Sequence, residues 1–184
     1  MAERFPNIEP AHRAFIERQH VFFTASAAAD GRVNLSPKGL DALRVLGANQ
    51  VCYLDLTGSG AETAAHLRVD GRLTIMLCAF DGPPLILRLY GRGRTLLRGS
   101  APYAEILKAA FNGEERIGAR AIVVLDVEMV QTSCGYGVPA YSYERERPAL
   151  DNWAAAKGED GLTQYRLDKN NVSLDGLPTG MNDV

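Results

Sequence analysis

The sequence VCYLDLTGSGAETAAHLRVDG (residues 51–71) predicts a strand, a glycine-rich turn and a short helix in direct succession. The apolar run 51–56 suits a strand, residues 57–60 interrupt it, and residues 61–68 are good helix formers. The first backbone N–H groups of such a helix have no partner within the helix, and they lie at the positive end of its dipole. This order of elements therefore predicts an anion site, for which a phosphate is the usual occupant.

Two familiar phosphate motifs do not match this turn. The nucleoside-triphosphate loop needs Gly-Lys-Ser/Thr, and the turn has no lysine, while the dinucleotide fingerprint needs a third glycine where Thr63 stands. A helix start capped by Ser59 or Thr57 explains the same residues without any ligand. The turn alone leaves both interpretations open.

Composition excludes several classes of partner and cofactor. The chain has 184 residues, enough for one domain, and its 20 basic and 22 acidic residues give no surface suited to nucleic acid or anionic membrane. The N-terminal MAERFPNIEP lacks the apolar core of a secretory signal, and no apolar run reaches the roughly 20 residues of a membrane helix, so we expect a cytoplasmic protein. Three widely spaced cysteines and three histidines predict neither a disulfide nor a metal site.

Short links between apolar runs predict an antiparallel sheet. Asp30-Gly31 is typical of a tight hairpin turn, and residues 81–84 form another link too short for a crossover helix. Gly91 and Gly93 indicate a bulge or a close backbone approach. We therefore predict a mainly β (α+β) fold, an antiparallel barrel with short helices outside. The expected strands lie at 21–29, 32–36, 51–56, 72–80, 85–98 and 119–137, and the helices at 10–19, 61–68, 100–111 and 150–157.

The C-terminal quarter differs in character from the rest. After Ala140 the chain becomes polar, and its last residues, NNVSLDGLPTGMNDV, are too polar to fold alone. We expect one domain overall, in which residues 1–140 form the barrel and residues 141–184 pack on it or on a partner subunit.

Three motifs occur in a fixed order: NLSPKG (residues 34–39), YLDLTGSGAET (53–63) and ILRLYGRG (86–93). Together they resemble the pyridoxamine 5′-phosphate oxidase-like, FMN-binding split-barrel family, over residues 19–98. SCGYGVP (133–139) is similar to a feature of a bacterial subgroup described as pyridoxamine oxidase-related.

The resemblance implies a six-stranded split β-barrel that forms a homodimer, with FMN at the subunit interface and a small-molecule substrate. The flavin would make the chain an oxidoreductase, and no side chain is identified as an acid or a base. The implied contacts to the flavin ring and ribityl chain are Val33, Asn34, Leu35, Ser36 and Lys38. The implied contacts at the phosphate are Asp55, Leu56, Thr57, Ser59, Gly60, Glu62 and Thr63, with Arg88 as a further cofactor-binding residue.

One departure from the family concerns the phosphate. Pyridoxamine phosphate oxidases carry Arg-Lys directly after the serine of this turn, where Gly60 and Ala61 stand here. The cation must then come from elsewhere, and Lys38, Arg88 and Arg68 are the candidates. Glu62 opposes a phosphate unless its carboxylate points away or accepts a hydroxyl hydrogen. The C-terminal arginine-and-histidine pattern of those oxidases is also absent, which puts the vitamin substrate in question.

Other functions explain part of the same pattern. The chain could be a non-enzymatic flavin-binding redox module, or the same barrel could hold haem or a deazaflavin, or the cleft could be empty in an interaction protein. A haem would need His66 or His20 in the cavity, whereas we expect His66 to be half-buried. Trp153 covering the flavin from the partner subunit, and Cys134 beside the flavin edge, are further hypotheses.

Overall fold

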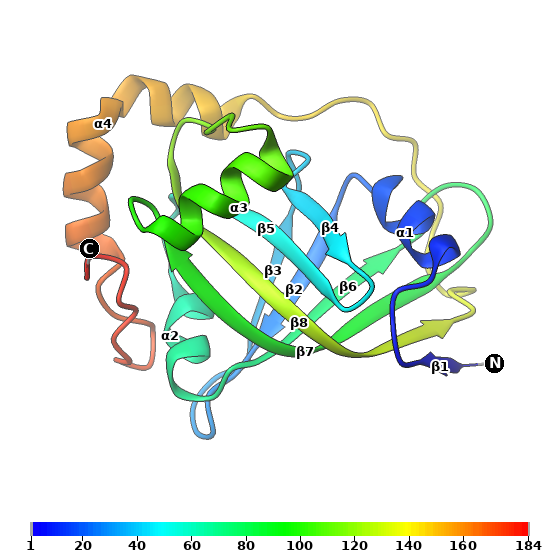
Figure 1. Ribbon diagram of the computed structural model, residues 1–184. Helices are drawn as coiled ribbons and strands as arrows, with labels where there is room; N and C mark the ends of the chain where they lie inside the picture. Colours follow the sequence, from blue (N-terminus) through cyan, green and yellow to red (C-terminus); the bar gives the residue numbers. More distant parts are fainter. Residues whose placement is uncertain (1, 184) are drawn as a thin grey trace.

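The computed structural model describes residues 2–183, and it contains eight strands and four helices in that range (Figure 1). The strands are β1 (Glu3–Phe5), β2 (Phe22–Ser26), β3 (Asn34–Lys38), β4 (Leu43–Gly47), β5 (Gln50–Leu56), β6 (Arg72–Cys78), β7 (Ile86–Leu97) and β8 (Ala119–Ser133). The helices are α1 (Pro10–Glu17), α2 (Glu62–Val69), α3 (Ala101–Phe111) and α4 (Ala149–Lys169).

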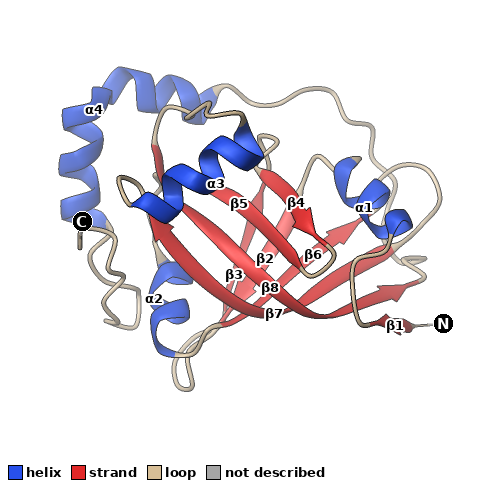
Figure 2. Ribbon diagram, in the orientation of Figure 1, coloured by secondary structure: helices blue, strands red, loops and turns tan. Residues whose placement is uncertain are grey.

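All strand pairs are antiparallel, and the order along the sheet is β3-β2-β6-β7-β8-β5-β4, with β1 also paired to β8. This confirms the mainly β class with short helices outside the sheet (Figure 2). The expected number of six strands is wrong, because β1 and β4 were not predicted. β1 has three residues and forms on the end of the 15-residue β8, and β4 forms a hairpin with β5, so both depend on a partner strand more than on their own pattern.

The two longest strands, β7 and β8, bend where the sequence predicted a bulge. Their register shifts between Tyr90 and Gly91, and a Cβ atom at Gly91 would lie 1.9 Å from the backbone oxygen of Asp126. A Cβ atom at Gly93 would lie 2.9 Å from leucine side chains. Glycine is therefore required for close approach at this bend, which lets the sheet curl.

The sheet curls around a core of aliphatic side chains. Fully buried leucine, isoleucine and valine residues of β5 to β8 fill its interior, among them Leu77, Leu87, Leu89 and Val124. The curl brings β3, one end of the strand order, opposite β5, near the other end. An ion pair between Lys38 and Asp55 crosses this opening.

The C-terminal region runs along the outside of the barrel (Figure 1). α4 consists of two helical pieces separated by Gly158, whose φ is 66°. The predicted helix 150–157 corresponds to the first piece, and the second piece was not predicted. The tail then returns toward α2 and buries Ser173, Thr179 and Met181 against the body. Across residues 2–183, the helices lack the combination of length and apolar character that crossing a bilayer requires.

Candidate functional site

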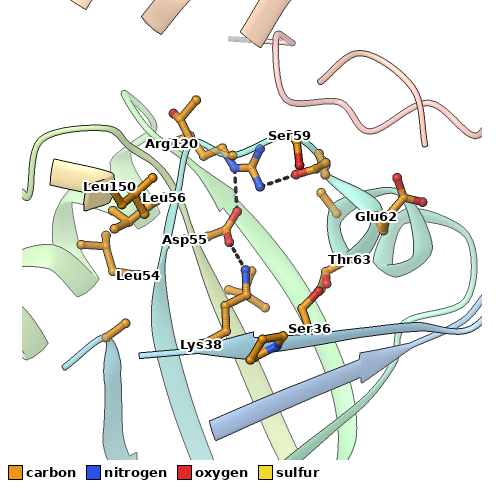
Figure 3. A pocket seen from close by; sticks show the side chains of 18 of the residues that line it. Ser36, Lys38, Leu54, Asp55, Leu56, Ser59, Glu62, Thr63, Arg120 and Leu150 are labelled. Atoms are coloured by element: carbon orange, nitrogen blue, oxygen red, sulfur yellow. Dashed lines mark hydrogen bonds and ion pairs between the residues drawn. The ribbon is translucent and has the colours of Figure 1, made fainter. Parts of the chain in front are cut away.

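A cavity of about 550 Å³ opens between β3, β5 and the first turn of α2. Figure 3 shows Ser36 and Lys38 on the β3 side, Asp55 on β5, and Ser59, Glu62 and Thr63 on the turn and helix that follow β5. Leu54, Leu56 and Leu150 supply apolar lining. The site thus combines a polar wall, an apolar wall and the glycine-rich turn.

A buried carboxylate between two cations lies at the centre of the cavity. Asp55 Oδ1 accepts a hydrogen bond from Lys38 Nζ at 2.9 Å, and Asp55 Oδ2 accepts one from Arg120 Nε at 2.7 Å (Figure 3). Burial acts to raise the pKa of Asp55, but Arg120 and Lys38 outweigh it and lower the pKa to about 2. The group is therefore ionised at neutral pH, and the three side chains together carry one net positive charge.

The glycine-rich turn is held from behind by residues distant in sequence. Arg120 Nη2 donates to the Gly60 backbone oxygen at 2.8 Å, and Asn170 Nδ2 donates to the Gly58 backbone oxygen at 3.0 Å. Arg120 Nη1 also donates to Asn170 Oδ1 at 2.8 Å, and the Thr57 hydroxyl donates to the Gly118 backbone oxygen at 2.8 Å. Both donors to the turn are buried, so its conformation is fixed by the folded chain.

The start of α2 carries no side-chain cap. Its N-cap residue is Ala61, and no side chain accepts a cap hydrogen bond there, so the interpretation of Ser59 or Thr57 as the cap is wrong. The first-turn N–H groups of α2 are consequently available to an anion in the cavity. The Glu62 carboxylate accepts the Leu174 backbone N–H through both oxygens, at 3.0 and 3.1 Å, so it is engaged by the C-terminal tail.

A chain of polar side chains orders the β3 wall. Asn34 Nδ2 donates to Thr63 Oγ1 at 3.1 Å, and the Ser36 hydroxyl donates to Asn34 Oδ1 at 3.2 Å. Behind them, Ser26 Oγ lies 3.1 Å from His66 Nδ1. His66 is 1% exposed, so the expectation of a half-buried histidine is wrong. The side chain is enclosed because α2, which carries it, packs directly on β2.

A buried tyrosine underlies the same wall. The Tyr53 ring centroid lies 5.6 Å from Lys38 Nζ, and its hydroxyl has no hydrogen-bond partner among the described residues. Burial and the nearby Asp55 raise the pKa of Tyr53, so the phenol stays neutral. Lys38 therefore lies between an aromatic face and a carboxylate.

The structure gathers most of the predicted site residues around this cavity and separates a few. The predicted residues that line it are Asn34, Ser36, Lys38, Asp55, Leu56, Thr57, Ser59, Gly60, Glu62 and Thr63. Val33 and Leu35, which alternate with the lining residues of β3, are 73% and 64% exposed. Arg88 and Arg68 do not line the cavity. Arg88 Nη1 donates to the Ser133 hydroxyl at 3.0 Å, and Arg68 pairs with Asp183 at 2.7 Å.

The sequence did not predict that the glycine-rich turn contacts Arg120, Asn170 and Arg166. Arg166 Nη1 donates to Thr57 Oγ1 at 3.3 Å, so a second arginine also reaches the turn. The run ARAIVVL (residues 119–125) contained a signal for Arg120, because a charge within a buried strand requires a partner. Asn170 and Arg166 had no comparable signal in the polar C-terminal region.

These features define a class of protein, an antiparallel split barrel with a glycine-rich turn and an uncapped helix start at its opening. The chain belongs to the pyridoxamine 5′-phosphate oxidase family, whose model matches residues 8–134. It is also 40% identical over 177 residues to the pyridoxamine 5′-phosphate oxidase family protein ustO of Aspergillus flavus, covering 88% of this chain and 71% of that protein.

Solved structures share the fold at low sequence identity. HupZ of Group A Streptococcus superposes with a TM-score of 0.53 at 16% identity, covering 73% of this chain and 99% of that one. A putative pyridoxamine 5′-phosphate oxidase from Lactobacillus delbrueckii gives a TM-score of 0.53 at 15% identity, covering 68% of this chain and 94% of that one. Both similarities support the split-barrel architecture.

Proposed function

We propose that the cavity between β3 and α2 binds FMN and that the chain is an FMN-dependent oxidoreductase of a small-molecule substrate. The observation that carries this proposal is the uncapped start of α2, which faces a cavity lined by Lys38 and backed by Arg120. The cavity volume of about 550 Å³ lies within the range typical of cofactor sites, roughly 300–1,000 Å³.

The phosphate of FMN would lie at the turn and the first turn of α2. Backbone N–H groups and the Ser59 and Thr63 hydroxyls can donate to it there. Arg120 and Arg166, both in contact with the turn, compensate for the missing Arg-Lys pair through positive potential. Glu62 does not prevent this arrangement, because its carboxylate is bound to the Leu174 backbone.

The ring and ribityl chain of FMN would extend along β3, past Ser36 and Lys38. When bound, FMN supplies hydride and electron transfer at its isoalloxazine ring. Lys38 supplies a positive charge that favours electron-rich forms of a neighbouring ring, and Asp55 fixes the direction of its ammonium group. Leu54, Leu56 and Leu150 exclude water from the apolar side.

We also propose that the protein forms a homodimer with the cofactor at the subunit interface. β3 ends the strand order, and the exposed side chains of Leu35 within it and Val33 just before it form an apolar edge beside the cavity. An exposed apolar edge strand is a favourable surface for a second copy. Val33, Leu35 and Arg88 would then contact cofactor or partner from outside the cavity of one protomer.

Haem receives less support than flavin. Among residues 2–183, the side chains lining this cavity include no histidine; His66 is bonded to Ser26 and His20 lies in a separate cleft. A non-enzymatic flavin module has the same binding site as an enzyme. It differs in turnover, so oxidation of reduced nicotinamide by the flavin-loaded protein with an added acceptor distinguishes the two.

The test begins with the visible spectrum of freshly purified protein and chromatographic identification of the molecule released by acid. We expect released FMN at about one per chain, whereas haem or a deazaflavin would contradict the cofactor assignment. FMN and riboflavin are then titrated into the stripped protein, and FMN should bind at least tenfold more tightly because only FMN has the phosphate.

Matched lysine variants test the position of the ring. Lys38→Gln should weaken FMN binding by about tenfold, since a charge-assisted contact is lost. Lys108→Gln, an exposed substitution on α3, should leave the affinity unchanged. Equal affinities of the two variants for FMN would refute the proposed placement of the cofactor.

A further inference from the structure

We infer that a second cleft, beside the first cavity, binds a planar aromatic carboxylate as the substrate of the proposed flavin site. This cleft of about 790 Å³ lies between the segment leading into β2, the turn after β6, and an extended strap formed by residues 139–148. Figure 1 shows the strap crossing the outside of the molecule between β8 and α4. Every residue of the strap is exposed.

Aromatic side chains of the strap pack against aromatic side chains of the body along the wall of the cleft. The rings of His20 and Tyr143 are stacked, with centroids 3.6 Å apart and planes 9° apart. The rings of Phe80 and Tyr141 lie 5.7 Å apart, and Tyr141 N donates to the Phe80 backbone oxygen at 2.8 Å. Tyr141 and Tyr143 remain 64% and 49% exposed, so a flat ring can cover aromatic surface that water now contacts.

Positive charge at the rim selects an anion. Arg18, Arg145 and Arg147 line the cleft, and none of them has an acidic partner within ion-pair distance among the described residues. Two acidic side chains, Asp81 and Glu146, line the same cleft, so arginine is in excess. The planar guanidinium fork matches a carboxylate, and the combination of stacking surface and free arginines therefore fits an aromatic carboxylate.

The cleft adjoins the proposed cofactor site. Residues 37–40 and Leu150 line both cavities, so a ligand in the cleft lies beside Lys38 and next to the flavin position. The strap lies beyond residues 8–134, the part that matches the family model. Recognition by the strap is therefore a property of this chain's C-terminal region, and the substrate role rests on the proposed flavin function.

The test uses three probes with the full chain, stripped of flavin and loaded with FMN. 2-Naphthoate has the ring and the charge, 2-naphthamide lacks the charge, and decalin-2-carboxylate lacks the aromatic ring. Calorimetric titration should show 2-naphthoate binding about tenfold more tightly than the amide, and several-fold more tightly than the decalin acid. In the loaded protein, 2-naphthoate should also shift the visible flavin spectrum.

Two tyrosine variants locate the binding. Tyr143→Leu should weaken 2-naphthoate binding by about two- to tenfold, because a stacking partner is lost. Tyr136→Leu, at a tyrosine that is 82% exposed and outside the cleft, should have no effect. Equal effects of the two variants, no preference among the three probes, or an unchanged flavin spectrum would overturn the inference. Selective naphthoate binding without any flavin binding supports the cleft and refutes the cofactor proposal alone.

Discussion

Replacing Arg120 with methionine tests whether the buried cation holds the glycine-rich turn. The Arg120 side chain is 5% exposed and donates to three acceptors: Asp55, Asn170 and the Gly60 backbone oxygen. Methionine keeps much of the volume but donates no hydrogen bond. The substitution leaves Asp55 with Lys38 alone and leaves the other two acceptors without this donor.

The expected loss of unfolding free energy is about 4 kcal/mol, because removing one partner of a buried ion pair costs about 3–5 kcal/mol. The individual contributions are not summed, since Lys38 still compensates Asp55 and water can reach the exposed Gly60. At a urea m-value of about 2 kcal/mol/M, this loss lowers the unfolding midpoint by about 2 M.

The assay is urea unfolding of protein stripped of small molecules at neutral pH, with Arg94→Met as the matched control. Arg94 pairs with Asp126 on the surface, where the two side chains are 48% and 51% exposed, so its loss should cost at most about 1 kcal/mol. If Arg120→Met is too unstable to purify, Arg120→Lys replaces it, because lysine retains the charge. The loss of unfolding free energy for Arg120→Lys should lie between those of Arg120→Met and Arg94→Met. A loss for Arg120→Met no greater than that for Arg94→Met would refute the role of Arg120.

Three further predictions concern acid stability, backbone approach and thiol reactivity. Because the pKa of Asp55 is lowered from 3.8 to about 2, the stabilisation by its ionised form is complete above about pH 5 and is lost as the pH falls through about 2. Between about pH 5 and pH 2, unfolding curves should show wild type losing about 2 kcal/mol more than Asp55→Asn, and parallel curves would contradict the assignment. Gly91→Ala should destabilise the protein by several kcal/mol, since a Cβ there meets a backbone oxygen at 1.9 Å, whereas Gly137→Ala, with nothing within 4 Å, should change stability by under about 0.5 kcal/mol. Of the three free thiols, the exposed Cys134 should react rapidly with Ellman's reagent, and the two buried thiols should react only on unfolding. Rapid reaction of the folded Cys134→Ser variant would contradict this prediction.

Local chemistry was sufficient to predict the central part of the fold. Asp30-Gly31 predicted an antiparallel hairpin, and β2 and β3 do pair. The predicted tight turn is wrong, because residues 27–33 connect the two strands and only Gly31 of the dipeptide has a positive φ. Gly91 marked the bulge in β7, because its lack of a side chain is itself the reason that the strands can approach there. β1 and β4 escaped prediction, since their short segments become strands only when β8 and β5 supply the pairing partners.

The amino-acid sequence by itself determined the β5-turn-α2 unit, because strand, turn and helix propensities act over a few residues. The family resemblance of its motifs added Asn34 and Thr63, which do line the cavity. Tertiary structure decided what stabilises that turn. Arg120 lies 65 residues from Asp55, and Asn170 lies 112 residues from Gly58. Contacts across such separations arise from the packing of β8 and the C-terminal tail. The local pattern marks Arg120 only as a charge in a buried strand that needs a partner, and it does not identify Asp55 or the glycine-rich turn as that partner.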